Sequence, residues 1–533
     1  MAKDDVTVAE QAGDRSPRGA RRRAARPYRH LVAPDPGRMR LRAASRAVLG
    51  IGAAVAAPAA AGLSLEACVI AGLAALLALF TVTDPTVRRQ AVTVALLPAV
   101  GVPVLTLALA LRDAPLLRDA AFLAVAFAGA YARRWGTRGH ALGVFGFMMF
   151  FAAQFLTTGL SGAPGLHAAL LLAVLVVCAV RFGLWCYERR TPPPPAPAPP
   201  GGRGLARPTT RLAVQTAAAC AFALAAGQLL SQERWYWAVG AAWWIFVNTA
   251  SRGETLVRGF RRVLGTLVGI VAGLWVAVPV DGGPVATGLL LSVCVFGIFY
   301  TAAVSYSWMM FFVTVLVGLL YGMLGALHPG LLQLRLIETA VGALGAGLAV
   351  AFVLPVTTHA ATHGWIRRAV RCVHACARES ALRLAGDESA DPARRIAELE
   401  MLLGRVRTSL APLVHPLSPL RARRARAREV LALLDDCARQ ARGLARVAAD
   451  PDASHDARLA DACRRVEEAV HRLTGPARDA CTNADETVTG QDTPCRHPGA
   501  DRALGHLHGL ETALVELAVP VHAPPRAPLT TAA

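Results

Sequence analysis

Long apolar runs dominate this sequence and limit what it can fold into. Twelve runs of about 16 to 24 residues are each long enough to cross the hydrocarbon core of a bilayer as an α-helix. Hydrophobic residues make up 54% of the 533-residue chain, a larger share than is usual in a soluble protein of this length. The sequence therefore predicts an all-α polytopic membrane protein with about 12 transmembrane helices, at roughly 44–62, 66–82, 89–111, 115–132, 140–160, 166–186, 211–230, 235–250, 262–280, 285–304, 307–327 and 336–356.

Arginines lie mainly in the segments that would share one side of the membrane. They fill the N-terminal tail and recur in the connections at 83–90, 132–140 and 251–262. The intervening turns near Ser64 and Ser161 carry no basic residue. Because basic loops stay in the cytoplasm, we expect a multi-pass protein of the cytoplasmic membrane with both termini inside.

A Pro-rich segment, residues 191–204, divides the apolar runs into two sets of six. Prolines favour an extended, semi-rigid spacer. The sets share two patterns in the same order: an acid-x-x-Val-Arg spacing after the second run, at 84–88 and 254–258, and Met-Met-Phe-Phe in the fifth run, at 148–151 and 309–312. Six spans per set give both halves one orientation, so we predict two parallel six-helix repeats.

The remainder of the chain is more polar. Helical periodicity is expected at about 364–386, 391–412, 420–448, 455–475 and 501–518, followed by a disordered end. The predicted domains are a basic cytoplasmic tail (1–45), a first membrane half (46–187), a Pro-rich cytoplasmic linker (188–210), a second membrane half (211–356) and a cytoplasmic helical domain (357–533).

Composition excludes several functional classes. The net charge of +20 lies mostly in the tails and between apolar runs, which argues against a nucleic-acid partner. The eleven cysteines form no Cys-x-x-Cys pair, so we expect free thiols. His359 and His363 have helical spacing but no evident third ligand, so no metal is predicted. With no Walker A loop and no catalytic constellation, we expect neither a cofactor nor an enzyme.

Three motifs in the second half carry a family resemblance. They are Tyr236-Trp237-Ala238, then Glu254-Thr255-Leu256-Val257-Arg258, then Arg262 through Gly265-Thr266 to Gly269. Residues 335–339, running on to Pro355, look like a matching last helix. Over about residues 211–356 the chain resembles the fusaric-acid-resistance (FUSC) and aromatic-acid exporter family of bacterial membrane proteins. The resemblance implies a membrane exporter of small aromatic carboxylic acids.

Glu338 is the leading candidate for a coupling residue. It lies one turn inside the last predicted span and three residues after Arg335, so the two side chains share a helix face. A charge in hydrocarbon is costly and usually faces a cavity or a partner. One interpretation is a proton-coupling carboxylate or gate. The alternative is an ion pair at the start of a helix.

A second group of charges lies in the polar loop predicted after residue 250. Its arginines have the chemistry to attract a carboxylate substrate at the inner mouth, although they would also serve simply to set topology, with Glu254 pairing Arg258. Asp84 and Arg88 are their expected counterparts in the first half. The candidate residues here are Glu254, Arg258, Arg261 and Arg262.

Aromatic residues and glycines complete the second half. Trp235, Tyr236 and Trp237 suit a membrane–water boundary. Trp243 and Trp244 lie mid-span, where they either stack on an aromatic solute or pack against protein and lipid. The four-residue spacing of Gly265, Gly269 and Gly273 favours close helix packing.

We therefore predict an exporter of small, aromatic carboxylic acids that is coupled to protons. The expected partners are a small organic anion and the lipid bilayer, with a homo-oligomer left open. Two alternatives remain at this stage: a passive organic-anion channel, and a non-transporting membrane scaffold that acts through its cytoplasmic tail.

Overall fold

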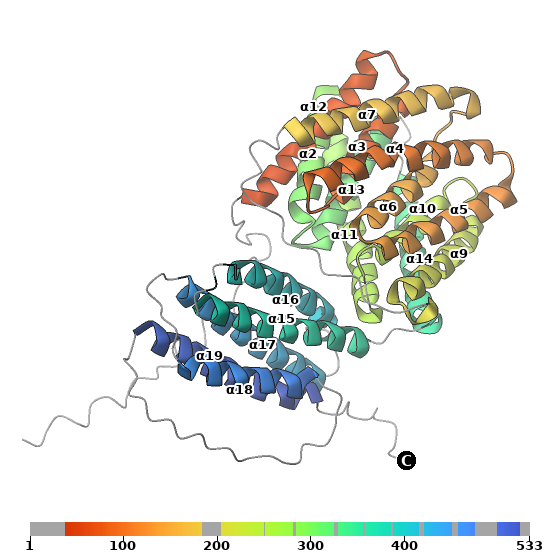
Figure 1. Ribbon diagram of the computed structural model, residues 1–533. Coiled ribbons are helices and arrows are strands. Elements are labelled where there is room, and N and C mark those ends of the chain that lie inside the picture. The colour runs from red at the N-terminus through yellow and green to blue at the C-terminus, as the bar shows by residue number, and fades with distance from the viewer. Residues whose placement is uncertain are drawn as a thin grey trace, which may run out of the picture.

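A computed structural model shows the chain as two groups of helices (Figure 1). It describes residues 38–183, 204–249, 251–280, 284–323, 329–354, 358–384, 387, 389–414, 421–449, 457–474 and 498–522. The basic tail up to residue 37, nearly all of the Pro-rich linker and the polar stretch 475–497 lie outside these residues. Within them the regular structure is helical, as expected.

Each predicted span contains one helix. The first half has α2 (Met39–Ala60), α3 (Leu65–Thr81), α4 (Val87–Ala110), α5 (Pro115–Tyr131), α6 (Gly136–Ala153) and α7 (Ala163–Gly183); a 3₁₀ turn, η3 (Ala132–Trp135), precedes α6. The second half has α9 (Pro208–Leu230), α10 (Tyr236–Phe246), α11 (Arg252–Val280), α12 (Pro284–Thr301), α13 (Tyr306–Met323) and α14 (Pro329–Phe352). Seven of the described segments are long and apolar enough to cross a membrane, which confirms an all-α polytopic membrane protein.

Two predicted boundaries are wrong, and both corrections affect candidate residues. The stretch predicted as a polar loop, 251–262, is instead the beginning of α11 from Arg252 onward. Helix α10 ends at Phe246, and Asn248 then adopts a positive φ of 64°, a conformation that Asn tolerates better than most residues. Helix α14 begins at Pro329, whereas the last span was predicted from 336. Glu338 is therefore nine residues into the helix, about 14 Å from its start.

Corresponding helices of the two halves pack in corresponding pairs. In the first half the contacts are α2–α3, α2–α7, α3–α7, α4–α6, α4–α7 and α5–α6. In the second half they are α9–α10, α9–α14, α10–α14, α11–α13, α11–α14 and α12–α13. The halves also contact one another reciprocally, because the first helix of each packs against the fourth helix of the other: α2 with α12, and α9 with α5.

Aromatic rings fill the contact between the halves. Phe147 of α6 stacks on Trp243 of α10 with ring centroids 4.0 Å apart. The rings of Trp235 and Tyr236 are buried among other side chains; that they lie at the depth of the membrane–water boundary stays a prediction. We call this cluster the aromatic seam; it comprises Phe122, Phe147 and Phe151 from the first half and Trp235, Tyr236, Trp237 and Trp243 from the second.

Two of the three spaced glycines bring α11 against α13. A Cβ at Gly265 would lie 2.5 Å from the backbone oxygen of Ser307, and one at Gly269 would lie 2.7 Å from the Thr314 Cβ. Side chains at these positions would push the helices apart. At Gly273 the nearest atom would be 3.9 Å away, so this glycine is not needed for the approach.

The C-terminal bundle has its own core. Its helices are α15 (Thr358–Leu384), α16 (Pro392–Val414), α17 (Arg421–Ala448), α18 (Ala457–Thr474) and α19 (Pro498–His522), and the buried side chains between them are mostly Leu, Val and Ala. Burial in this core raises the pKa of the Cys437 thiol to about 12, so that thiol stays neutral. Helices α15 and α16 contact α11. We call the end of the membrane region next to these helices the bundle end, and the opposite end the far end.

Candidate functional site

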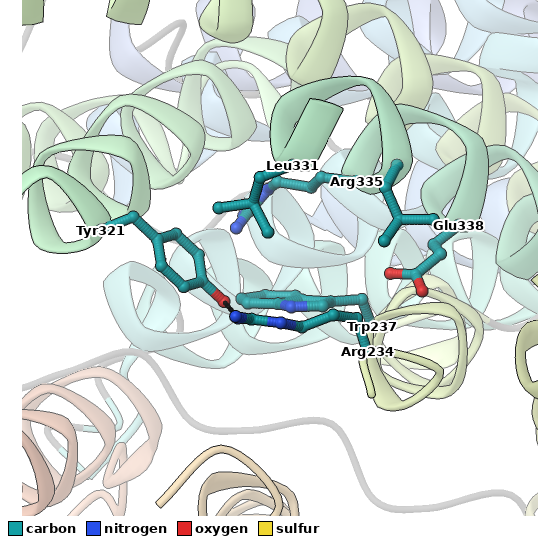
Figure 2. A pocket seen from close by; sticks show the side chains of 7 residues that line it. Arg234, Trp237, Tyr321, Leu331, Arg335 and Glu338 are labelled. Atoms are coloured by element: carbon teal, nitrogen blue, oxygen red, sulfur yellow. Dashed lines mark hydrogen bonds between the residues drawn. The ribbon is translucent and has the colours of Figure 1, made fainter. Parts of the chain in front are cut away.

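A pocket toward the far end gathers charged and aromatic side chains from three elements (Figure 2). The end of α13, the first part of α14 and the start of α10 meet here. We call it the Glu338 pocket. It has room for about one water molecule, and its lining residues are Arg234, Trp237, Tyr321, Leu331, Leu334, Arg335 and Glu338.

Glu338 is fully buried and unpaired in this pocket. Its relative exposure is 0%, and neither carboxyl oxygen has a hydrogen-bond partner. Arg335 lies one turn away on the same helix and is 7% exposed. Its guanidinium does not bond to Glu338; it lies over the Trp237 ring, with Cζ 4.2 Å from the ring centroid. The predicted pair therefore shares a pocket, but the helix-start ion pair of the alternative interpretation does not form.

Close helix packing explains why Arg335 reaches Trp237. A Cβ at Gly342 of α14 would lie 2.5 Å from the backbone oxygen of Ala238 in α10, so the two helices approach closely only because this residue is glycine. Trp237 also packs edge-on against Phe151 of the aromatic seam at 5.6 Å. The indole is thus held from one side by the first half and offers a ring face to Arg335.

Sequence analysis missed two residues of the pocket. Arg234 donates a hydrogen bond from Nη1 to the Tyr321 hydroxyl at 3.2 Å, and its guanidinium lies 5.4 Å from the Tyr321 ring centroid. Figure 2 shows this bond as a dashed line beside the Trp237 indole. The sequence feature that could have pointed to Arg234 is its position directly before the aromatic triplet 235–237 at the helix start.

A second pocket lies at the bundle end, between the halves. We call it the Arg133 pocket; it too has room for about one water molecule. Arg133 of η3 donates from Nη1 to the Phe246 backbone oxygen at 3.2 Å. Neither Arg133 nor His140 was singled out from the sequence. The lining residues are Gly129, Ala130, Arg133, His140, Thr216, Trp243, Phe246 and Val247.

Two arginines of the predicted basic group contact Tyr306 of α13. The Arg258 guanidinium lies over the Tyr306 ring, 4.0 Å from its centroid, and Arg262 donates to the Tyr306 hydroxyl at 3.1 Å. Arg258 and Glu254 also interact electrostatically with Arg133. Arg261 lines neither pocket.

Asp84 and Arg88 do not lie together. Asp84 is 4% exposed and accepts a hydrogen bond from the Thr137 hydroxyl at 3.1 Å, whereas Arg88 is exposed. The buried cation near this helix end is Arg181, which donates to the side chain of Gln90 at 3.0 Å. Sequence analysis did not identify Arg181.

The mid-span tryptophans are fixed by hydrogen bonds. Trp243 donates from Nε1 to the Ala126 backbone oxygen at 3.1 Å, and Trp244 donates to the Met148 sulfur at 3.2 Å. Trp243 nevertheless lines the Arg133 pocket. Among the residues that the structure describes, no group of three or more His, Cys, Asp or Glu is placed to hold a metal ion.

Comparison with known proteins gives one match. Residues 220–350 match the model of a family described as fusaric acid resistance protein-like. No curated protein matches the chain. The matched segment runs from α9 to α14 and includes all seven residues that line the Glu338 pocket. Together with the apolar helices, it indicates a multi-pass membrane transporter, and such transporters are generally not enzymes. The match supports a FUSC-family assignment for the second membrane half, over residues 220–350.

Proposed function

We propose that this protein exports small aromatic carboxylic acids across the cytoplasmic membrane by a proton-coupled mechanism. The observation that carries the proposal is the fully buried Glu338, with two unpartnered carboxyl oxygens, one turn from an arginine that stacks on a tryptophan. Such intramembrane ionisable residues usually mark a transport pathway or a proton relay.

The unpaired carboxyl group supports proton coupling. Leaving a charged group buried without a partner costs several kcal/mol, so we propose that Glu338 holds a proton in this conformation. Arg335 is then free to bind the carboxylate of a substrate. When the substrate leaves and Glu338 loses its proton, the new carboxylate is the nearest partner for Arg335. Protonation of Glu338 and anion binding at Arg335 are thereby linked.

The aromatic rings support an aromatic substrate. A guanidinium presents paired N–H donors that match a carboxylate, and Trp237 and Tyr321 supply ring faces beside Arg335 and Arg234. A planar aromatic acid fits both features, with its carboxylate on an arginine and its ring against a ring. Offset stacking of this kind is worth about 0.5–1.5 kcal/mol beyond surface burial.

Movement between the halves would open the pathway. Both pockets have room for only about one water molecule, so an aromatic acid requires them to widen. The matching helix pairs support two parallel six-helix repeats, and rocking of one repeat against the other is a common means of alternating access. Trp237 and Trp243 of α10 reach the far-end and bundle-end pockets respectively.

Efflux of an aromatic-acid panel that includes benzoate tests this function. It is measured from cells with and without the gene, and with and without a protonophore. We expect gene-dependent efflux against a gradient that the protonophore abolishes. Glu338→Gln, which keeps the shape but cannot ionise, should lower this efflux at least tenfold at an unchanged membrane level. Glu233→Gln is the matched control, because this exposed carboxylate lies in the turn before α10.

Other results point to other functions. Gene-dependent movement that only runs down a gradient, whatever the protonophore does, indicates an anion channel. Normal uphill export by Glu338→Gln removes Glu338 from the coupling step. If no acid moves in a gene-dependent way, the aromatic substrate class is wrong.

A further inference from the structure

The Arg133 pocket is bounded by both membrane halves, and its arginine and histidine lie on the first-half side. Arg133 and His140 come from η3 and α6, while Thr216 and Trp243 come from α9 and α10. The bond from Arg133 to the Phe246 oxygen uses one of the five N–H donors of a guanidinium. The pocket thus has a cationic side next to an aromatic wall.

Positive charge from two further elements converges on this place. Arg258 of α11 and Arg405 of α16 both interact electrostatically with Arg133 and with His140. Glu254 is the carboxylate that acts on Arg133. Arg133 is therefore subject to the charge of two other guanidinium groups and of one carboxylate. Like charges at close range destabilise one another, and a bound anion would relieve that repulsion.

Arg405 belongs to the C-terminal bundle rather than to the membrane region. Its helix, α16, contacts α11, the helix that carries Arg258 and Glu254, and Arg405 interacts electrostatically with Arg133. Arg405 is exposed, so its guanidinium remains hydrated and reachable from the water on that side. The bundle is therefore placed to contribute charge to the bundle-end opening.

We propose that Arg405, Arg133 and Arg258 form an anion-binding entrance to the transport pathway, with the C-terminal bundle supplying part of the site. The ligand is a carboxylate; that it is an aromatic one rests on the function proposed above. Guanidinium groups bind carboxylates through paired hydrogen bonds, and Trp243 and Phe246 lie directly beyond Arg133 in the pocket. The bundle thereby helps to capture substrate before the halves move.

Equilibrium binding of radiolabelled benzoate to the purified full-length protein tests the entrance. The protein is held in nanodiscs of phosphatidylcholine only, so that no anionic lipid headgroup competes. Arg405→Gln should weaken binding about five- to tenfold, and Arg405→Lys, which keeps the charge, should recover most of it. Added salt should weaken binding to the wild type more than binding to Arg405→Gln, because a screened charge contributes less.

Arg394→Gln is the matched control. Arg394 is an exposed arginine of the same helix, α16, about 16 Å from Arg405 along the helix axis, and we expect its loss to leave the affinity unchanged. Thermal melting of each variant checks that the fold is intact. Because Arg405 is exposed, its replacement should leave the melting temperature unchanged.

Each other outcome overturns the proposal in a recognisable way. If Arg133→Gln weakens binding and Arg405→Gln does not, the pocket binds anions without the bundle. If benzoate binds and neither variant changes the affinity, the anion site lies elsewhere. Both results leave the proposed export function standing. If the wild type does not bind benzoate at all, the entrance is wrong for aromatic acids, and the proposed substrate class fails with it.

Discussion

At the scale of single residues, the central feature is an arginine that stacks on an aromatic ring while a carboxyl group one turn away has no partner. Sequence spacing puts Arg335 and Glu338 on one face of α14, where an ion pair is the ordinary expectation. Instead Arg335 lies over Trp237, and both Glu338 oxygens lack a partner. A contact between cation and ring of this kind is worth roughly 0.5–2 kcal/mol and holds the guanidinium ready for an anion.

Replacing Arg335 by Lys tests whether export needs only the positive charge or also the planar geometry of the guanidinium. Lysine keeps the positive charge but loses the planar fork and most of the stacking on Trp237. We expect export of aromatic acids to fall at least tenfold at an unchanged membrane level, measured as initial efflux rate per amount of protein. Arg252→Lys, at the exposed start of α11, is the control. If Arg335→Lys exports at the wild-type rate, a positive charge at this position is sufficient for export.

At the scale of elements, glycine residues decide which helices approach closely, because they carry no side chain. Gly265 and Gly269 allow α11 to lie against α13, and Gly342 allows α14 to lie against α10. The latter contact matters for function, because it brings Trp237 within reach of Arg335. Small residues at such positions are typical of helix packing in membranes, where close van der Waals contact drives association.

A pair of alanine substitutions tests the α11–α13 contact. In Gly265→Ala the new methyl group meets the backbone oxygen of Ser307 at 2.5 Å, and backbone cannot move aside as a flexible side chain would. We expect destabilisation of about 1–3 kcal/mol, seen as a lower melting temperature of the purified protein. Gly273→Ala, on the same helix, places its methyl group no closer than 3.9 Å to another atom and should melt like the wild type. Equal melting of both variants would contradict the packing argument.

At the scale of the whole molecule, the two membrane halves are joined by packing as well as by chain. Two reciprocal helix contacts, α2–α12 and α5–α9, flank the interface, and the aromatic seam fills it. Buried aromatic rings contribute strongly to such contacts because each removes a large apolar area and stacks in defined geometry. We therefore expect the halves to hold together without their covalent connection.

Splitting the chain within the Pro-rich segment tests this expectation. Residues 1–195 and 196–533, expressed together, should purify as a complex when one fragment carries the tag. Phe147→Ala in the first fragment removes the ring that stacks on Trp243 at 4.0 Å, and it should lower recovery of the partner severalfold. Failure of the unmodified fragments to purify together would show that the linker itself is required.

The sequence by itself determined where the helices lie and that the protein is a membrane protein. Run length and apolar content are local properties, and hydrocarbon admits only helices or closed barrels. All twelve expected spans and five C-terminal helices therefore appear close to their expected positions. The resemblance also marked Trp237, Glu338 and Arg335, because their motifs are short and contiguous.

Only the tertiary structure decided which of these residues meet. Arg335 stacks on Trp237, not Glu338, because α10 presents a ring there. Trp235 is buried and packs edge-on against Phe122 of the first half, which is more than 100 residues away in the chain. Arg405 interacts electrostatically with Arg133, and α16 contacts α11. Each of these contacts joins elements distant in sequence, and residue spacing carries no information about such pairs.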